Sequence, residues 1–269
     1  MALPQPSRSS TALVTGASSG IGAEIARELA RRGHGVTLVA RREERLRELA
    51  GELKDAHGIN AGTFACDLGD AAARDALTAE IGKRGLEVEI LVDNAGFGGF
   101  GSFVELGRER QLDMVRLNVE AMVDLMGRYM PLMQQRGRGG IINIASVAAF
   151  QPLPDNATYA ATKAFVLSLG EAVHEELKGS GVTVTTVCPG PVRTEFMDAA
   201  DMSGAEENTP GFVWTTPEEV AAEAVTGAEK GKRVVVPGTL SQAAALVGQH
   251  SPRFVALPLA KQIWRRAVP

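Results

Sequence analysis

Three polar residues of this chain have the types and the spacing for proton transfer. Tyr159 and Lys163 stand four residues apart in an expected helix over residues 158–179, and Ser146 follows an expected strand. Residues i and i+4 share one helix face, so the Lys163 ammonium can stabilise the Tyr159 phenolate and lower its pKa from about 10. Tyr159 would then act as general acid and base, while Ser146 donates to a substrate oxygen that gains negative charge. Taken alone, Tyr159 and Lys163 could also form an ordinary surface pair.

Asn118 is a fourth candidate for the same proton-transfer site. It lies between Leu117 and Val119 in one expected helix over residues 108–135, where an asparagine costs helix propensity. We expect Asn118 to interrupt the helical hydrogen bonds locally and to hold a water that links Lys163 to solvent. That water would complete a proton relay.

A glycine-rich turn stands between the first expected strand, residues 12–15, and a helix over residues 22–32. Glycine allows a sharp strand-to-helix turn and lets a pyrophosphate approach the backbone. The residues predicted to contact a dinucleotide here are Gly16, Ser18, Ser19, Gly20, Ile21 and Gly22. A tight turn without a ligand is the alternative, but the position between a strand and a helix favours the dinucleotide.

Arg41 and Arg42 follow the second expected strand and indicate which dinucleotide binds. A free ribose 2′-hydroxyl is usually held there by an acid, whereas a 2′-phosphate needs positive charge and donors. The two arginines therefore predict NADP(H), with NAD(H) less favoured. Alternatively, they belong to a charged helix face with Glu43 and Glu44.

Further cofactor contacts are expected where the third and fourth strands end. Asp67 follows the third, and Asn94, Ala95 and Gly96 follow the fourth. The carboxyl ends of parallel strands line one crevice, so these residues should lie beside the adenine and ribose. For Asp67, capping the next helix is an equal alternative.

Short apolar runs alternate with longer amphipathic stretches along the whole chain, which is typical of βαβ units in a parallel sheet. Seven strands are expected, at residues 12–15, 36–40, 62–66, 88–93, 140–145, 182–188 and 233–236. Helices are expected at residues 22–32, 43–57, 71–83, 108–135, 158–179 and 217–230. Successive apolar residues such as Ile141 and Ile142 indicate strands covered by helices on both faces, hence an α/β three-layer sandwich.

Composition excludes several functional classes. The 269 residues are 45% hydrophobic with a formal charge of -4, which argues against disorder and against nucleic acid as a partner. The two cysteines, Cys66 and Cys188, have no metal-ligand spacing, so no metal is expected, and they favour a reducing cytoplasmic location. The first ten residues lack the apolar core of a signal peptide, and no run reaches membrane-spanning length.

Together, the glycine turn, Asn94-Ala95-Gly96, Asn118, Ser146, Tyr159, Lys163 and Pro189-Gly190 resemble the short-chain dehydrogenase/reductase family, in order and spacing over residues 11–194. The resemblance implies a Rossmann-like domain with seven parallel strands and hydride transfer between a nicotinamide and a carbonyl or alcohol. By the same resemblance, Tyr159 is the acid and base, Lys163 also holds the nicotinamide ribose, Ser146 orients the substrate, and Asn118 supports the water.

The resemblance adds the cofactor contacts Pro189, Gly190, Val192 and Thr194, the last at the nicotinamide carboxamide, and implies a homodimer or homotetramer. Two features depart from the family pattern. Asp93 stands where many members have a second asparagine, and we expect it to alter local hydrogen bonding without removing activity. The glycine turn carries no basic residue, so the NADP(H) prediction rests on Arg41 and Arg42.

Apolar loops at the expected crevice predict an apolar small-molecule substrate. We expect Phe97, Phe150 and Phe196, with Ser146, to contact it, and residues 197–215 to form a closing lid. The catalytic domain should span residues 1–236. The extension, residues 237–269, either packs over the pocket or an interface, which we favour, or binds a membrane surface through Lys261, Arg265 and Arg266.

The function predicted is thus an NADP(H)-dependent oxidoreductase with Tyr159 as acid and base. Three alternatives stay open: a catalytically silent dinucleotide-binding regulator, an NAD-dependent dehydrogenase of the same fold, and an isomerase, dehydratase or epimerase that uses the nicotinamide transiently.

Overall fold

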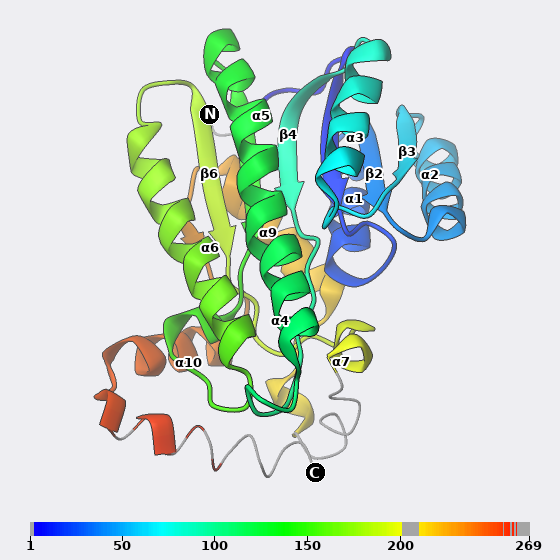
Figure 1. Cartoon of the computed structure of the whole chain (residues 1–269). Helices are drawn as coiled ribbons and strands as arrows, with labels where there is room; N and C mark the ends of the chain where they lie inside the picture. The colour runs from blue at the N-terminus through cyan, green and yellow to red at the C-terminus, as the bar shows by residue number, and fades with distance from the viewer. Residues whose placement is uncertain (1–2, 201–209, 255, 259, 261, 263–269) are drawn as a thin grey trace.

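A computed structural model describes residues 3–200, 210–254, 256–258, 260 and 262 of the chain (Figure 1). Seven strands form one sheet in the order β3-β2-β1-β4-β5-β6-β7, and every neighbouring pair is parallel. The strands are β1 (Ser10–Thr15), β2 (Val36–Ala40), β3 (Ala61–Ala65), β4 (Glu87–Asp93), β5 (Gly139–Ile144), β6 (Val182–Val187) and β7 (Val234–Val235). All seven predicted strands are present.

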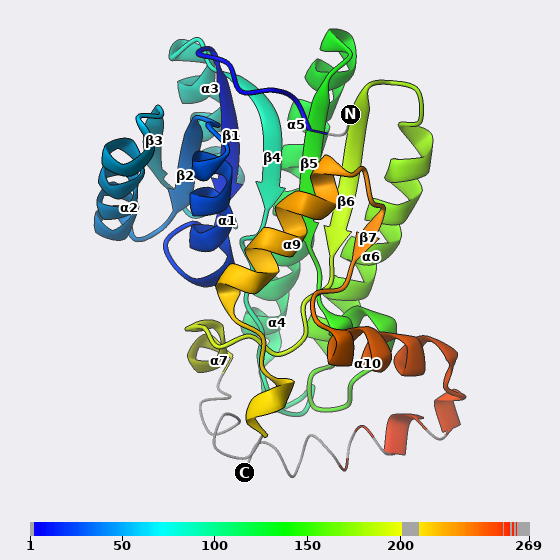
Figure 2. The same cartoon turned by 180° about the vertical axis from the view of Figure 1, so that it is seen from behind.

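Helices cover both faces of this sheet, as Figures 1 and 2 show from opposite sides. The α-helices are α1 (Gly20–Arg31), α2 (Glu43–His57), α3 (Ala71–Lys83), α4 (Arg108–Val115), α5 (Ala121–Arg136), α6 (Ala157–Glu176), α7 (Phe196–Ala199), α9 (Pro217–Glu229) and α10 (Thr239–His250). One apolar cluster joins the sheet to α1, α2 and α9, and a second joins it to α3, α5 and α6. The predicted three-layer α/β fold, Rossmann-like, is confirmed.

The central strands are apolar on successive residues because both of their faces are buried. On β5, Ile141 belongs to the cluster under α5 and α6, while Ile142 belongs to the cluster under α1 and α9. Both side chains are fully buried. Such a strand cannot show the polar alternation of a half-exposed sheet.

The structure corrects the single long helix predicted over residues 108–135. α4 ends at Val115, a π-helical turn η1 (Arg116–Glu120) follows, and α5 begins at Ala121. Asn118 lies in the middle of this turn and is buried. The expectation that the helical ladder is interrupted at Asn118 is therefore confirmed, and such π-turns often occur at functional sites.

The sheet order also fixes where a ligand can bind. β1 lies between β2 and β4, so the chain leaves its carboxyl end in one direction and returns on the other side. Ligands of open α/β sheets bind in the crevice at this switch point. The segments after β1, β2, β3, β4, β5 and β6 all reach this end of the sheet (Figure 1).

The C-terminal segment lies at the same end of the molecule, where α10 contacts the 3-10 turn η2 (Val147–Phe150) (Figure 2). Ser241 and Gly248 of α10 are buried against this end of the sheet. A Cβ atom added at Gly190 would lie 2.1 Å from Ser241 Oγ, and a Cβ atom added at Gly248 would lie 3.4 Å from the Gln151 side chain.

No helix in the described part of the chain is long and apolar enough to cross a membrane. The division at residue 236 stays a prediction. Lys261, Arg265 and Arg266 lie outside the described residues, as do residues 201–209 of the predicted lid.

Candidate active site

One cleft of about 910 Å³ opens at the carboxyl ends of the strands and gathers most of the predicted site. The predicted residues that line it are Gly16, Ser18, Ser19, Gly20, Ile21, Arg41, Arg42, Asp67, Asn94, Ala95, Gly96, Phe97, Ser146, Tyr159, Lys163, Pro189, Gly190, Val192, Thr194 and Phe196. They come from seven separate segments of the chain. The cleft has the size of a cofactor and substrate site.

Three predicted residues do not line the cleft. Phe150 packs against the core under α5 and α6 instead of the substrate wall, because the turn η2 presents Val147 and Ala148 to the cleft. Gly22 lies beneath the glycine turn, against Asn94 and the Gly16 carbonyl. Asn118 lies behind the cleft wall and lines a separate small pocket.

The glycine turn is held from below by Asn94. Its Nδ2 donates to the carbonyl oxygens of Thr15, at 2.9 Å, and Gly16, at 3.3 Å. A Cβ at Gly22 would lie 2.4 Å from this nitrogen, so only glycine fits there. Gly16 and Gly20 have φ of 64° and 55°, which glycine adopts without strain. The glycines thus shape a backbone cradle, and Asn94 braces it.

Arg42 links this turn to the far side of the cleft. Its guanidinium donates to the hydroxyls of Ser18 and Ser19, at 3.0 and 2.7 Å, and to Glu195 at 2.6 Å. Arg45 donates to the other oxygen of Glu195 at 2.5 Å. Arg41 is exposed at the cleft and forms no hydrogen bond within the described residues. Arg41, Arg42, Arg45 and Glu195 therefore line the cleft, and the arginines do not belong only to a charged outer face of α2.

The structure separates the two roles considered for Asp67. Asp70, not Asp67, caps α3, because its Oδ1 accepts from the Ala72 amide at 2.9 Å. Asp67 accepts from the Gly69 amide at 2.9 Å and lines the cleft. The helix-capping alternative for Asp67 is thus wrong.

Tyr159 and Lys163 share the first turns of α6, at the other end of the cleft. The Lys163 ammonium donates to the Ile144 carbonyl at 2.8 Å and lies 5.8 Å from the Tyr159 ring centre. Burial lowers the pKa of Lys163 to about 8. Burial also raises the pKa of Tyr159 to about 12, while its hydrogen bond with Ser146 acts in the opposite direction. The expected lowering of the Tyr159 pKa is therefore not found in the free chain, because burial outweighs every favourable contact.

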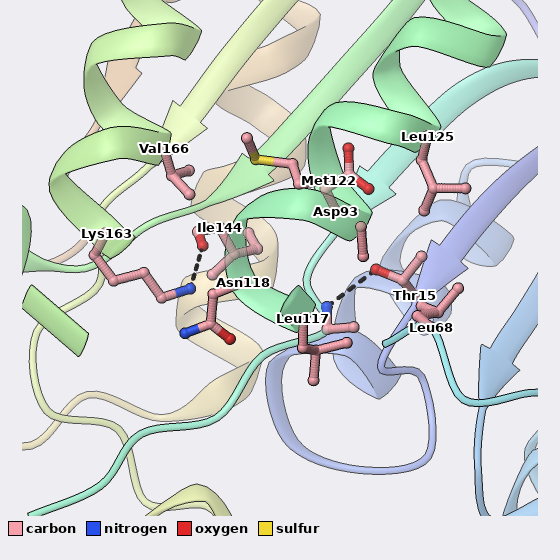
Figure 3. A pocket seen from close by; sticks show the side chains of 12 residues that line it. Thr15, Leu68, Asp93, Leu117, Asn118, Met122, Leu125, Ile144, Lys163 and Val166 are labelled. Carbon is pink, nitrogen blue, oxygen red and sulfur yellow. Dashed lines mark hydrogen bonds between the residues drawn. The ribbon is translucent and has the colours of Figure 1, made fainter. Parts of the chain in front are cut away.

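Asn118 clamps the segment that leaves β4. Its Oδ1 accepts from the Phe97 amide at 3.1 Å, and its Nδ2 donates to the Phe97 carbonyl at 3.0 Å and to Thr162 Oγ1 at 3.1 Å. Beside it lies a small pocket of about 10 Å³, which Lys163 also lines (Figure 3). That volume is about the space one water molecule needs. The predicted water relay has room here and stays a prediction.

Asp93, the departure from the family pattern, lines this small cavity too (Figure 3). It is buried, and its Oδ2 has no hydrogen-bond partner within the described residues. Lys163 lines the same cavity, and Tyr129 of α5 lies within electrostatic range. Burial nevertheless raises the pKa of Asp93 well above its ordinary value. The folded chain therefore holds this carboxyl protonated where an unfolded chain ionises.

Asp93→Asn is expected to stabilise the fold as the pH rises. The unfolded Asp93 loses its proton above about pH 4, whereas the folded one retains it, so wild-type stability falls with pH over this range. An amide at this position does not titrate, so the advantage of Asp93→Asn should widen by up to about 1.4 kcal/mol per pH unit. Urea unfolding between pH 4 and 8 measures it. Asp55→Asn, on the exposed face of α2, is the control; parallel pH profiles for all three proteins would contradict the expectation.

Sequence reasoning missed several residues of the cleft. Those that the sequence did not indicate include Arg45, Leu68, Leu117, Asn156 and Glu195. Met197, Val213 and Trp214 also line the cleft, and they belong to the predicted lid, residues 197–215. Glu195 directly follows the predicted contact Thr194, and this proximity was an available signal. Gln151 and Leu153 belong to one of the apolar loops expected at the crevice, whereas Asn156 reaches the cleft only through the path of the β5–α6 connection, for which no local pattern exists.

Comparison with known proteins identifies a family whose sequences resemble this chain. A sequence model of the family described as short chain dehydrogenase matches residues 10–203. A putative ketoacyl reductase of Streptomyces coelicolor is 36% identical over 254 residues, which cover 93% of this chain and 95% of the relative. A very-long-chain 3-oxoacyl-CoA reductase of Anas platyrhynchos is 32% identical, over 82% of this chain and 69% of the relative.

Solved structures of related proteins are also similar to this chain. A short-chain dehydrogenase from Sphingobium yanoikuyae in complex with NADPH is 36% identical, with a TM-score of 0.78 over 88% of this chain and 92% of that one. An actinorhodin polyketide ketoreductase with NADPH is 33% identical, with a TM-score of 0.75 over 86% and 96% of the two chains. Both similarities extend over nearly the whole fold described above.

Proposed function

The chain belongs to the short chain dehydrogenase family, and we propose that it transfers a hydride between NADP(H) and the carbonyl or alcohol group of an apolar small molecule. The observation that carries this proposal is the layout of the cleft. Arg42 and the glycine turn lie at one end, and Ser146, Tyr159 and Lys163 lie at the other. A nucleotide phosphate and a reacting carbonyl can therefore occupy one continuous site.

The cofactor end fits a phosphorylated dinucleotide. The backbone of Gly16 and Gly20 leaves room for a pyrophosphate, and Arg41, Arg42 and Arg45 supply positive charge for a 2′-phosphate. Two of the structural relatives are complexes with NADPH, which supports the same cofactor. When bound, NADPH supplies the hydride.

The residues at the other end handle the proton. With a pKa near 12, Tyr159 stays protonated at neutral pH, which is the form that donates to a carbonyl oxygen during reduction. Ser146 donates a second hydrogen bond to that oxygen as it gains negative charge. Lys163, held between Ile144 and the Tyr159 ring, and Asn118, beside the small cavity, position the proton path behind Tyr159.

The substrate wall suits an apolar carbonyl compound. Phe97, Leu153, Phe196 and Trp214 line the same cleft as Tyr159, and the Phe196 ring centre lies 5.5 Å from that of Tyr159. Two of the relatives named above reduce ketoacyl compounds by name, so acyl-chain ketones are the first class to test. A homodimer or homotetramer and a cytoplasmic location stay predictions of the sequence.

Calorimetric titration of the purified protein with NADPH and NADH tests the cofactor. We expect NADPH to bind at least about 10-fold more tightly, because only its 2′-phosphate can use the arginine charges. Loss of NADPH absorbance then reports turnover across ketones, aldehydes, sugars, steroids and acyl thioesters, with apolar ketones expected to react fastest. Tight binding without turnover on any class would instead support the silent regulator, and an NADH preference would remove the arginines from the cofactor site.

A further inference from the structure

Glu195 connects the two sides of the cofactor end of the cleft. Its carboxylate accepts from Arg42 at 2.6 Å and from Arg45 at 2.5 Å. Both arginines belong to the start of α2, on the β2 side, whereas Glu195 belongs to the segment that runs from β6 into α7. The pairs therefore join segments that are about 150 residues apart in the sequence.

These contacts adjoin the glycine turn. A Cβ at Gly20 would lie 3.0 Å from Thr194 Cγ2, so the segment before Glu195 already touches the turn. Arg42 holds Ser18 and Ser19 of the same turn while it holds Glu195. The arginine donors that a 2′-phosphate would need are thus engaged by a carboxylate of the chain itself.

The carboxylate is charged but only loosely held. Hydrogen bonds from Arg45 and Arg42 lower the pKa of Glu195 to about 2, so it is ionised at neutral pH. The side chains of Arg42, Arg45 and Glu195 are 44%, 46% and 47% exposed. Ion pairs this exposed are weak and are screened by salt. A phosphate, with up to two charges and more acceptor oxygens, is the stronger partner for the same guanidinium groups.

We propose that Glu195 is a specificity-determining residue: an internal counterion that competes with the cofactor 2′-phosphate for Arg42 and Arg45 and is displaced when that phosphate binds. The inference rests on the proposed function, because it requires a cofactor with a 2′-phosphate. A dinucleotide without that phosphate leaves the Glu195 pairs intact.

The displacement also reaches the substrate end. Glu195 directly precedes Phe196, whose ring lies against Tyr159 at 5.5 Å and within 3.0 Å of the Cβ position of Gly98. Loss of the arginine contacts frees the segment that carries this aromatic wall. Binding of NADP(H) thereby frees the segment with Phe196 to adjust to the substrate. NAD(H) has no 2′-phosphate and leaves this segment held.

Titration with two adenosine fragments tests the competition without any turnover. Adenosine 2′,5′-bisphosphate contains the 2′-phosphate, and AMP differs from it only in lacking that phosphate. Glu195→Gln is expected to bind the bisphosphate about 3- to 10-fold more tightly than wild type in low salt, because two exposed ion pairs no longer compete. AMP affinity should stay within about 2-fold, and the gain should shrink at 0.5 M salt.

Glu43→Gln is the matched control, since it removes the same charge from an ion pair with Arg47 on the same helix, outside the cleft lining. Unchanged or weaker bisphosphate binding by Glu195→Gln would overturn the competition. The proposed function is judged separately, by whether the wild type prefers the bisphosphate to AMP at all. A preference in the wild type with no gain in the variant refutes only the inference about Glu195.

Hydrogen exchange of the free protein tests the release of the segment. We expect peptides covering residues 193–200 to exchange faster in Glu195→Gln than in wild type, and Glu43→Gln to match wild type there. Equal exchange in all three proteins would show that the arginine pairs do not hold the segment, and would overturn this part of the proposal.

Discussion

Tyr159→Phe is expected to lower kcat/KM for carbonyl reduction by about 1,000-fold while the Kd for NADPH stays within about 3-fold of wild type. The substitution removes a single hydroxyl, the one placed to donate a proton to the substrate oxygen. The ring remains, so its packing against Phe196 and beside the Lys163 ammonium persists. Steady-state rates with the best ketone of the substrate screen and calorimetry with NADPH measure the two quantities.

The chain provides its own control, because Tyr129 is its only other tyrosine. Tyr129 is buried in the core under α5 and α6 and does not line the cleft. Tyr129→Phe should keep kcat/KM within about 3-fold of wild type, since it leaves the reacting atoms untouched. If Tyr159→Phe kept more than about a tenth of the wild-type kcat/KM, Tyr159 would not be the general acid, a role usually worth at least 100-fold.

The parts of the site that the sequence predicts well are those set by local spacing. Tyr159 and Lys163 share a helix face because they are four residues apart, and Gly16 and Gly20 adopt positive φ because the strand must turn there. These features need no knowledge of distant segments. The seven strands were predictable for a similar reason, since double-sided burial makes each of the central ones a short apolar run.

The parts that the sequence does not predict depend on how distant segments meet. The raised pKa of Tyr159 follows from its burial in the cleft wall, and the spacing to Lys163 does not reveal that burial. Phe150 turns into the core because the Ser146 hydroxyl accepts from the Ala148 amide and caps the short turn η2. The pairing of Glu195 with Arg42 joins segments that only the sheet order brings together.

Asn118 has one property that the sequence predicts and one that it does not. Its low helix propensity in a long amphipathic stretch correctly indicated an interrupted helix. The clamp on Phe97 was not foreseeable, because it requires the connection after β4 to fold back against the π-turn. A polar residue at an unfavourable position thus indicates that a tertiary contact exists without identifying the partner.

The second large effect is expected at the other end of the cleft, where Arg42→Ala should weaken NADPH binding by about 30- to 100-fold. A charge-assisted hydrogen bond to phosphate contributes about 2 to 3 kcal/mol, and every tenfold change in Kd corresponds to about 1.4 kcal/mol. Arg47→Ala, whose partner Glu43 lies on the outer side of the same helix, should leave binding unchanged. Calorimetry with NADPH and NADH for the three proteins supplies the comparison.

The ratio of the two affinities decides between two roles for Arg42. The guanidinium also donates to Ser18 and Ser19, so its loss could loosen the glycine turn and weaken both cofactors alike. If Arg42 selects the 2′-phosphate, NADH affinity stays within about 3-fold and the preference for NADPH collapses, since NADH never used that charge. If both affinities fall by the same factor, Arg42 is a brace for the turn, and the selection of NADP(H) passes to Arg41 and Arg45.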